Sequence, residues 1–135
     1  MVYPSYKRQF ESSPIFQLTN SAALAAQSYW IVDLATDIPQ AVKYLPFNQL
    51  AVSNVSNYVI RVYFNQGNRY VAVPANSTKI YDKESMPALN TAKVFNADSS
   101  NSIAAELISL EMQRVQYSSS DLIANIHQFI NKRRL

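Results

Sequence analysis

Apolar residues alternate with polar ones through most of residues 50–81, which read LAVSNVSNYVIRVYFNQGNRYVAVPANSTKIY. The alternation is clearest in YVIRVYF at 58–64. Successive side chains of a β-strand point to opposite faces, so this period of two predicts strands with one buried face. The NQGN sequence around Gly67 predicts a hairpin turn, because Asn and Gly adopt positive φ at little cost. Residues 70–73 are then expected to return antiparallel, and residues 78–81 to form a further strand.

Shorter strand candidates lie on both sides of this stretch: IFQLT (15–19), YWIVDL (29–34) and AKVFN (92–96). Residues 21–26, SAALAA, favour helix by their alanines and strand by their surroundings. Pro39 and Pro46 make residues 37–47 a connection with at most a short helical turn. Turns spaced about every 8 to 12 residues, with no long helical period between strands, indicate an antiparallel sandwich or barrel.

Residues 103–117, IAAELISLEMQRVQY, fit two interpretations. A helix would group Ile103, Leu107, Leu110 and Arg114 on one side. A strand from residue 106 would place alternate positions, ISLEMQ, on an apolar and a polar face. Because the polar and apolar sets separate more cleanly at period two, we predict a strand and keep the helix as the alternative.

The two ends of the chain differ from this pattern. Residues 1–14 follow neither period, and we expect an extended N-terminal arm whose aromatic residues dock on their own domain or on a neighbour. Residues 118–135 begin with serines and Asp121 as helix caps and carry apolar residues along one helical stripe, which predicts an amphipathic α-helix. The predicted assembly residues are Tyr3, Tyr6 and Phe10 in the arm and Ile126, Phe129 and Ile130 in the helix.

These segments give three expected parts: an arm at 1–14, a β-sandwich at 15–117 and a helix at 118–135. The terminal helix has several possible partners, which are its own sandwich, another subunit, a membrane surface or nucleic acid. Basic residues gather at the chain's ends, where Lys132, Arg133 and Arg134 are candidate electrostatic contacts. Residues 9–131 hold seven basic and nine acidic residues, so the body is slightly acidic.

Composition limits the class of protein. A chain of 135 residues suits one domain with a real core. Only 16% of residues are charged, so the charge coat is thin, which suggests that partners cover part of the surface. The absence of Cys excludes disulfides and thiolate metal sites. No stretch resembles a signal peptide or reaches the ~20 apolar residues of a membrane span, so a soluble, unsecreted protein is expected.

Nothing in the sequence predicts catalysis. His127 is the sole histidine and falls beside the apolar stripe of the terminal helix, and the acidic residues are scattered. Glycine-rich phosphate loops and nucleophile elbows are absent from the sequence. We therefore expect no enzyme, no cofactor and no metal site. Two glycosylation sequences, at Asn54 and Asn76, are interpreted as coincidence.

Three segments together resemble a known group of proteins: LAVSNVSNYVIRVYFN, RYVAVPANSTKIYD and KVFNADSSNSIAAELISL. Their order of strand, Asn-Ser turn, hairpin and Pro-Ala turn is similar to small sandwich or jelly-roll modules in structural proteins of viruses and tailed phages. The resemblance implies a jelly-roll-like sandwich in a capsid, vertex or tail component that assembles by repeated subunit contacts. The implied partners are the protein itself and other virion proteins, with no small-molecule substrate. The implied location is the virion, and the host cytoplasm before assembly.

Two other functions stay open at this stage. One is a carbohydrate- or ligand-binding sandwich that uses Trp30 and surface tyrosines as stacking platforms, although Trp30 within YWIV fits a core position better. The other is a nucleic-acid-binding protein that uses its basic termini. The same terminal residues also suit the headgroups of an acidic membrane surface.

Overall fold

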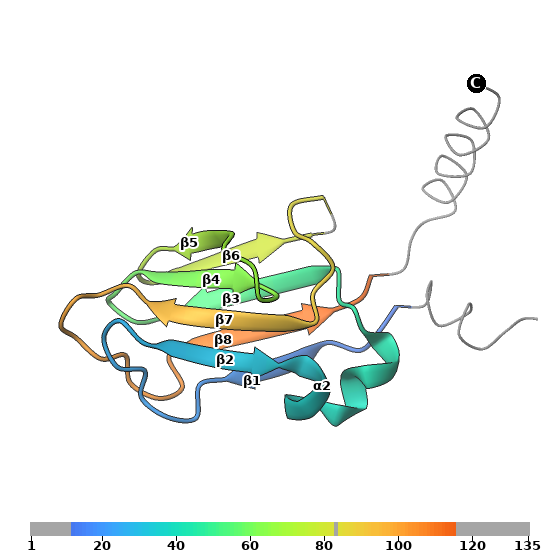
Figure 1. Cartoon of the computed structure of the whole chain (residues 1–135), viewed down its shortest axis with the longest axis horizontal. Coiled ribbons are helices and arrows are strands. Elements are labelled where there is room, and N and C mark those ends of the chain that lie inside the picture. The colour runs from blue at the N-terminus through green and yellow to red at the C-terminus, as the bar shows by residue number, and fades with distance from the viewer. Residues whose placement is uncertain (1–11, 83, 116–135) are drawn as a thin grey trace, which may run out of the picture.

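The computed structural model describes residues 12–82 and 84–115 of the chain. These residues form eight β-strands (Figure 1): β1 (Phe16–Thr19), β2 (Tyr29–Asp33), β3 (Gln49–Asn54), β4 (Ile60–Phe64), β5 (Tyr70–Val73), β6 (Ser77–Tyr81), β7 (Thr91–Asn96) and β8 (Ile108–Gln113). Between β2 and β3 lie a short helix α2 (Leu34–Asp37) and a 3₁₀ helix (Pro39–Tyr44). The described part of the chain is therefore mainly β.

The strands form two four-stranded antiparallel sheets within the described residues, in the orders β1-β8-β3-β6 and β2-β7-β4-β5. The first strand pairs with the last, the second with the seventh, the third with the sixth and the fourth with the fifth. This nested pairing is that of one long hairpin rolled into two layers, which defines an eight-stranded jelly roll.

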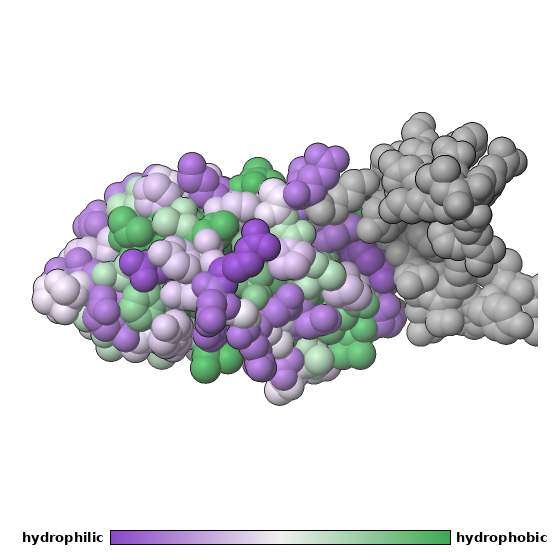
Figure 2. All heavy atoms as spheres, turned by 45° about the horizontal axis from the view of Figure 1, so that its top comes forward, coloured by the Kyte–Doolittle hydropathy of each residue, from purple (hydrophilic) through white to green (hydrophobic). Residues whose placement is uncertain are grey.

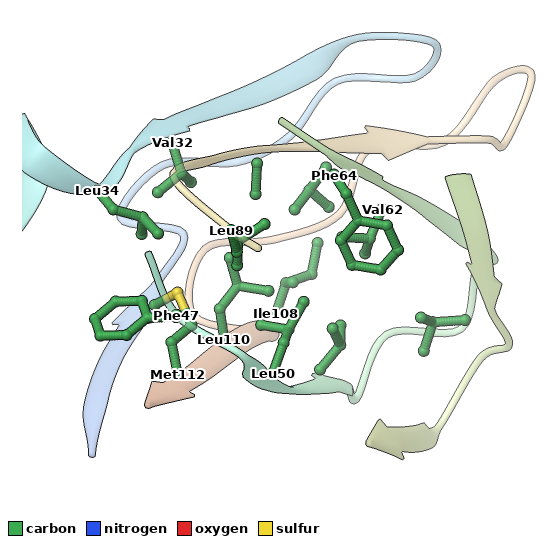
Figure 3. Close-up of a cluster of buried hydrophobic side chains, with 14 of the residues drawn as sticks. Val32, Leu34, Phe47, Leu50, Val62, Phe64, Leu89, Ile108, Leu110 and Met112 are labelled. Carbon is green, nitrogen blue, oxygen red and sulfur yellow. The ribbon is translucent and has the colours of Figure 1, made fainter. Parts of the chain in front are cut away.

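The core lies between the two sheets, and the alternation in the sequence explains it. In β3, β4 and β8 the residues that occupy every second position are buried. Figure 3 shows Leu50, Leu110 and Met112 from one sheet facing Val32 and Val62 from the other. β-Branched and aromatic residues suit such a half-buried pleated surface, and their burial drives the packing of the layers.

Most predicted strands are confirmed, including the strand rather than the helix after residue 103. Residues 21–26 form neither predicted element, but Leu24 makes an isolated bridge with Ile103. The hairpin around residue 67 is present, with the positive φ of 56° on Asn65 and not on Gly67. Asn tolerates this conformation because its short polar side chain bonds locally. The Asn65 side chain accepts from the Asn90 backbone N–H at 2.9 Å.

Three buried asparagines hold the loops where strands end. Asn20 follows β1, and Asn54 and Asn96 are the last residues of β3 and β7. Each side-chain amide donates to backbone carbonyls of loops and accepts from a backbone N–H. Loop backbone that leaves a ladder needs such partners, so these residues replace the missing sheet bonds. The buried Asn54 amide is engaged in this way, which disfavours glycosylation there.

Candidate interaction surfaces

The two ends of the described chain meet at one point. The Ser13 backbone N–H donates to the Arg114 carbonyl at 2.8 Å, and the Arg114 N–H donates to Ser13 Oγ at 2.8 Å. The neighbouring Val115 is fixed by Asn48, whose side chain accepts from the Val115 N–H at 2.7 Å and donates to its carbonyl at 3.1 Å. Both terminal segments therefore start side by side at the same end of the jelly roll (Figure 1).

The predicted assembly residues all lie outside the described residues. This holds for Tyr3, Tyr6, Phe10, Ile126, Phe129 and Ile130, for the cations Lys132, Arg133 and Arg134, and for His127. Their roles stay predictions. The structure contributes the common starting point of the two segments that carry them.

The outer side of the β2-β7-β4-β5 sheet carries rings and cations. We name it the aromatic–cation face and define it by seven of its outward residues: Tyr29, Ile31, Arg61, Tyr63, Tyr70, Lys93 and Phe95. Asp33, Ala72 and Thr91 lie on the same side of the sheet. Strand register brings them together, because residues directly opposite each other point to the same side of a sheet. Tyr29 lies opposite Phe95, and Tyr63 lies opposite both Lys93 and Tyr70.

Each cation of this face lies between two rings. Lys93 Nζ is 5.0 Å from the ring centres of both Tyr29 and Tyr63. The Arg61 guanidinium is 4.8 Å from the Tyr70 ring and 5.7 Å from the Phe95 ring. Cations are attracted to the negative faces of aromatic rings at these distances, so the rings stabilise the two positive charges in these positions.

The rings also pack on one another across the strands. Tyr29 lies 4.8 Å from Phe95 and 6.0 Å from Tyr63, and Tyr63 lies 5.1 Å from Tyr70, centre to centre and all tilted. Tyr29, Tyr70 and Ile31 stay 48%, 46% and 69% exposed. Figure 2 shows hydrophobic and hydrophilic groups interspersed on the side of the molecule that it displays. The face thus offers fixed apolar groups and fixed charges together.

The outer side of the other sheet is chemically different. We name it the amide face and define it by its outward residues, which are Gln17, Thr19, Gln49, Ala51, Ser53, Thr78, Ile80, Ser109, Glu111 and Gln113. Glu111 is the single charged residue in this described set. A hollow of about 120 Å³ lies over the face, lined by Glu111, Ala51, Ile80 and Ile15 among others. Gln17 donates to Ser109 at 2.9 Å, and Gln113 donates to Gln49.

Two further hollows lie at the edges. One of about 160 Å³ is lined by Asn48, Gln49, Asp82, Glu84 and Val115. The other, of about 240 Å³, lies beside the β4-β5 hairpin, where Arg69 and Ser85 are its polar groups with Tyr70. Within residues 12–82 and 84–115, no three histidine, cysteine or acidic side chains come close enough to hold a metal. No helix of that same part is long and apolar enough to cross a membrane.

Two groups have shifted pKa values. Backbone N–H groups of Ser100 and Asn101 donate to the Asp98 carboxylate at 3.0 and 2.6 Å, and they lower its pKa. Burial raises the pKa of Tyr81, whose ring packs edge-on against Phe64. Hydrogen bonds to a charged form favour it, whereas burial disfavours it. The first group closes a loop and the second lies beside the core.

Trp30 does not form a stacking platform. It alternates with the outward Tyr29 and Ile31, lies opposite Val94 and packs partly buried against the core. The core interpretation of Trp30 is therefore confirmed. Sequence reasoning missed the aromatic–cation face, although its signal was present: in YVIRVYF, the positions between the buried residues Ile60, Val62 and Phe64 are Arg61 and Tyr63.

By fold, the described part of the chain is an eight-stranded jelly roll. Its two outer faces differ in chemistry. No protein-family model matches the sequence, and a search of curated proteins finds no match. Among solved structures, the coat protein of Tobacco streak virus is similar, with a TM-score of 0.39 and 12% identity over 78% of this chain and 87% of that one. A second structure of that coat protein, a dimer, gives a TM-score of 0.38 and 12% identity over 77% and 86%. The resemblance predicted from the sequence is to structural proteins of viruses, and both of these solved structures are of a virus coat protein.

Proposed function

We propose that this chain is a non-enzymatic structural protein of a virus particle. It acts as a capsid, vertex or tail component and assembles by repeated contacts with copies of itself and other virion proteins. It resides in the virion, and in the host cytoplasm before assembly. The observation that carries the proposal is the jelly roll with both terminal segments starting at one point.

The jelly roll and its filled interior support this function. Viral capsid domains use this architecture, but lectins and cupins use it too, so the fold alone does not decide. A small ligand needs a concave site of suitable size. Here, the described interior is filled by side chains such as Phe47, Leu50 and Leu110, each with no exposed surface. The outer faces and the ends are therefore the parts available for function.

The common starting point of the terminal segments supports assembly. The Ser13–Arg114 hydrogen bonds bring the first and last parts of the described chain together. In this proposal the segments that continue from them contact the same neighbouring subunit. In this proposal, Tyr3, Tyr6 and Phe10 and then Ile126, Phe129 and Ile130 bury their apolar side chains on adjacent subunits. Symmetric self-association is the usual state of such proteins.

The test is the mass of the full-length chain in solution, by light scattering with negative-stain electron microscopy. We expect a defined oligomer or particle. Full-length variants with Ile126, Phe129 and Ile130 changed to Ser, or with Tyr3, Tyr6 and Phe10 changed to Ser, should lose association. Their thermal unfolding midpoint should stay near that of the unchanged chain, because in this proposal these side chains pack on neighbouring subunits and not on their own core.

A variant with Lys132, Arg133 and Arg134 changed to Ala serves as the matched control. It removes charge and leaves the apolar contacts, so the oligomer should persist. If the intact chain remains a monomer at every concentration tested, the proposal is wrong. If the control variant instead loses salt-sensitive binding to nucleic acid, the basic terminus has that additional role.

A further inference from the structure

We infer that the aromatic–cation face of one copy docks on the amide face of a second copy, head to tail. This inference rests on the proposed function, because it says which surfaces of the sandwich meet when subunits assemble. The occupant of each face is thus another molecule of this chain. The argument comes from charge, from apolar shape and from the position of the two faces.

Charge complementarity is the first step. Arg61 and Lys93 lie in the middle of one face, each fixed between two rings. Glu111 lies at the centre of the other face, on β8, which pairs with β1 on one side and β3 on the other. Facing potentials of opposite sign steer encounter and fix register. Asp33, the acid at the end of β2 on the same side, leaves this face with a net positive charge. Arg61 and Lys93 therefore meet Glu111 when these faces dock.

Apolar fit is the second step. Ile31, Tyr29 and Tyr70 protrude from the aromatic–cation face with large exposed fractions. Ile80 of the amide face and Ile15 just before β1 are 68% and 63% exposed, and both border the hollow of about 120 Å³. Tyrosine and arginine are enriched at the centres of protein interfaces, where they enter desolvated pockets. The protruding groups of one face thus meet a hollow with apolar borders on the other.

The chemistry favours a protein partner over single-stranded nucleic acid. Single-stranded nucleic acid needs flat ring faces that are free for base stacking. On this face the rings are tilted against one another at 40–60° and pack on each other. Ile31, the most exposed apolar group there, has no stacking surface. A folded surface with an acid at its centre fits these features better.

The arrangement of the faces makes the contact repeat. They lie on opposite sides of the same sandwich, so each copy engages two neighbours at once. Such a heterologous contact continues until it closes into a ring or shell, or extends as a filament. Burial of the two faces also accounts for their exposed isoleucines, which water solvates poorly.

The experiment uses charge reversal in the full-length chain. Lys93→Glu and Glu111→Lys each place like charges at the contact, and we expect association about tenfold weaker for each, measured by sedimentation velocity. The double variant Lys93→Glu/Glu111→Lys restores opposite charges and should recover to within about threefold of the unchanged chain. An equimolar mixture of the two single variants should recover likewise. Lys79→Glu, on β6 but outside both defined faces, is the matched control and should leave association unchanged.

A second variant tests the apolar part. Ile31→Ser keeps all charges and removes an exposed side chain, so it should weaken association without lowering the unfolding midpoint. If Lys93→Glu, Glu111→Lys and Ile31→Ser all associate as strongly as the intact chain, this inference is wrong and the proposed function stands. Failure of the double variant to recover would also overturn the inference, because only a contact between these two faces restores the pairing.

Two other outcomes would also show the inference to be wrong. If Lys93→Glu abolishes binding of a labelled single-stranded oligothymidylate while association persists, the face binds nucleic acid and the inference is wrong. If the unchanged chain is monomeric throughout, the proposed function itself is wrong, and the contact with it. Failure of the inference shows only in the variants, whereas failure of the proposed function shows in the unchanged chain. The two failures are therefore distinguishable.

Discussion

A single buried amide, that of Asn54, joins two turns of the jelly roll. Its Nδ2 donates to the carbonyls of Tyr58 and Pro74 at 2.8 and 3.1 Å, and its Oδ1 accepts from the Ser56 N–H at 3.1 Å. Asn54→Ala removes these hydrogen bonds from buried and partly buried backbone groups. We expect the free energy of unfolding to fall by about 2 to 4 kcal/mol.

Chemical denaturation measures this change. Asn57→Ala is the matched control, because Asn57 is exposed on the same turn and the substitution is identical. It should alter the free energy of unfolding by less than about 0.5 kcal/mol. Equal losses for the two variants would show that the buried amide has no special role.

Asp98 gives a pH dependence at the same scale. Its folded pKa is lower than its ordinary value of 3.8, chiefly because the Ser100 N–H bonds its carboxylate. The charged form therefore stabilises the loop fully above the unfolded pKa, and this contribution disappears as the pH falls through the lower folded pKa. Asp98→Asn should lower the unfolding midpoint at neutral pH and converge with the unchanged chain in acid. An Asp98 titration by NMR at or above pH 3.8 would contradict this.

At the scale of an element, β8 holds the first sheet together, because it pairs with both β1 and β3. Leu110 lies at its centre with no exposed surface. Leu110→Ala should leave a cavity and lower the free energy of unfolding by about 2 to 5 kcal/mol. Ser109→Ala, the next residue on the outward side, should change it little. Similar losses at both positions, measured by denaturant unfolding, would argue against the alternating strand.

Period two made β8 predictable, since Ile108, Leu110 and Met112 are buried while Glu111 is exposed. The pairing of strands was not predictable in this way. β6 follows the β4-β5 hairpin in sequence but pairs with β3 in the other sheet, a choice made by the whole core and not by local residues. The same limit applies to the aromatic–cation face. Alternation puts Tyr29 and Tyr63 on outward positions, but only sheet order places their rings together.

The roles of the three buried asparagines also could not be predicted from the local sequence. The Asn-Ser sequences predicted turns, and turns occur there. Burial of the Asn20, Asn54 and Asn96 amides depends on loops from distant parts of the chain, such as Ala104 for Asn20. A sequence pattern indicates where backbone leaves a sheet, but not which side chain completes the missing bonds.

At the scale of the whole molecule, the net charge of +3 is small, so charge acts through placement rather than through its sum. The proposed contact brings Arg61 and Lys93 toward Glu111, whereas the proposed terminal contacts are mainly apolar. Salt screens the first type and leaves the second, because the Debye length falls from about 10 Å at 0.1 M to about 3 Å at 1 M.

Association of the intact chain should therefore weaken as sodium chloride rises from about 0.1 to 1 M, without reaching zero. Lys93→Gln should associate more weakly at low salt and show a shallower dependence, because one of the screened charges is gone. Ile31→Ser should keep the slope of the intact chain while shifting its level. Sedimentation velocity across the salt series separates these cases. A slope that Lys93→Gln leaves unchanged would place the salt-sensitive charges elsewhere, with the basic terminus as the next region to test.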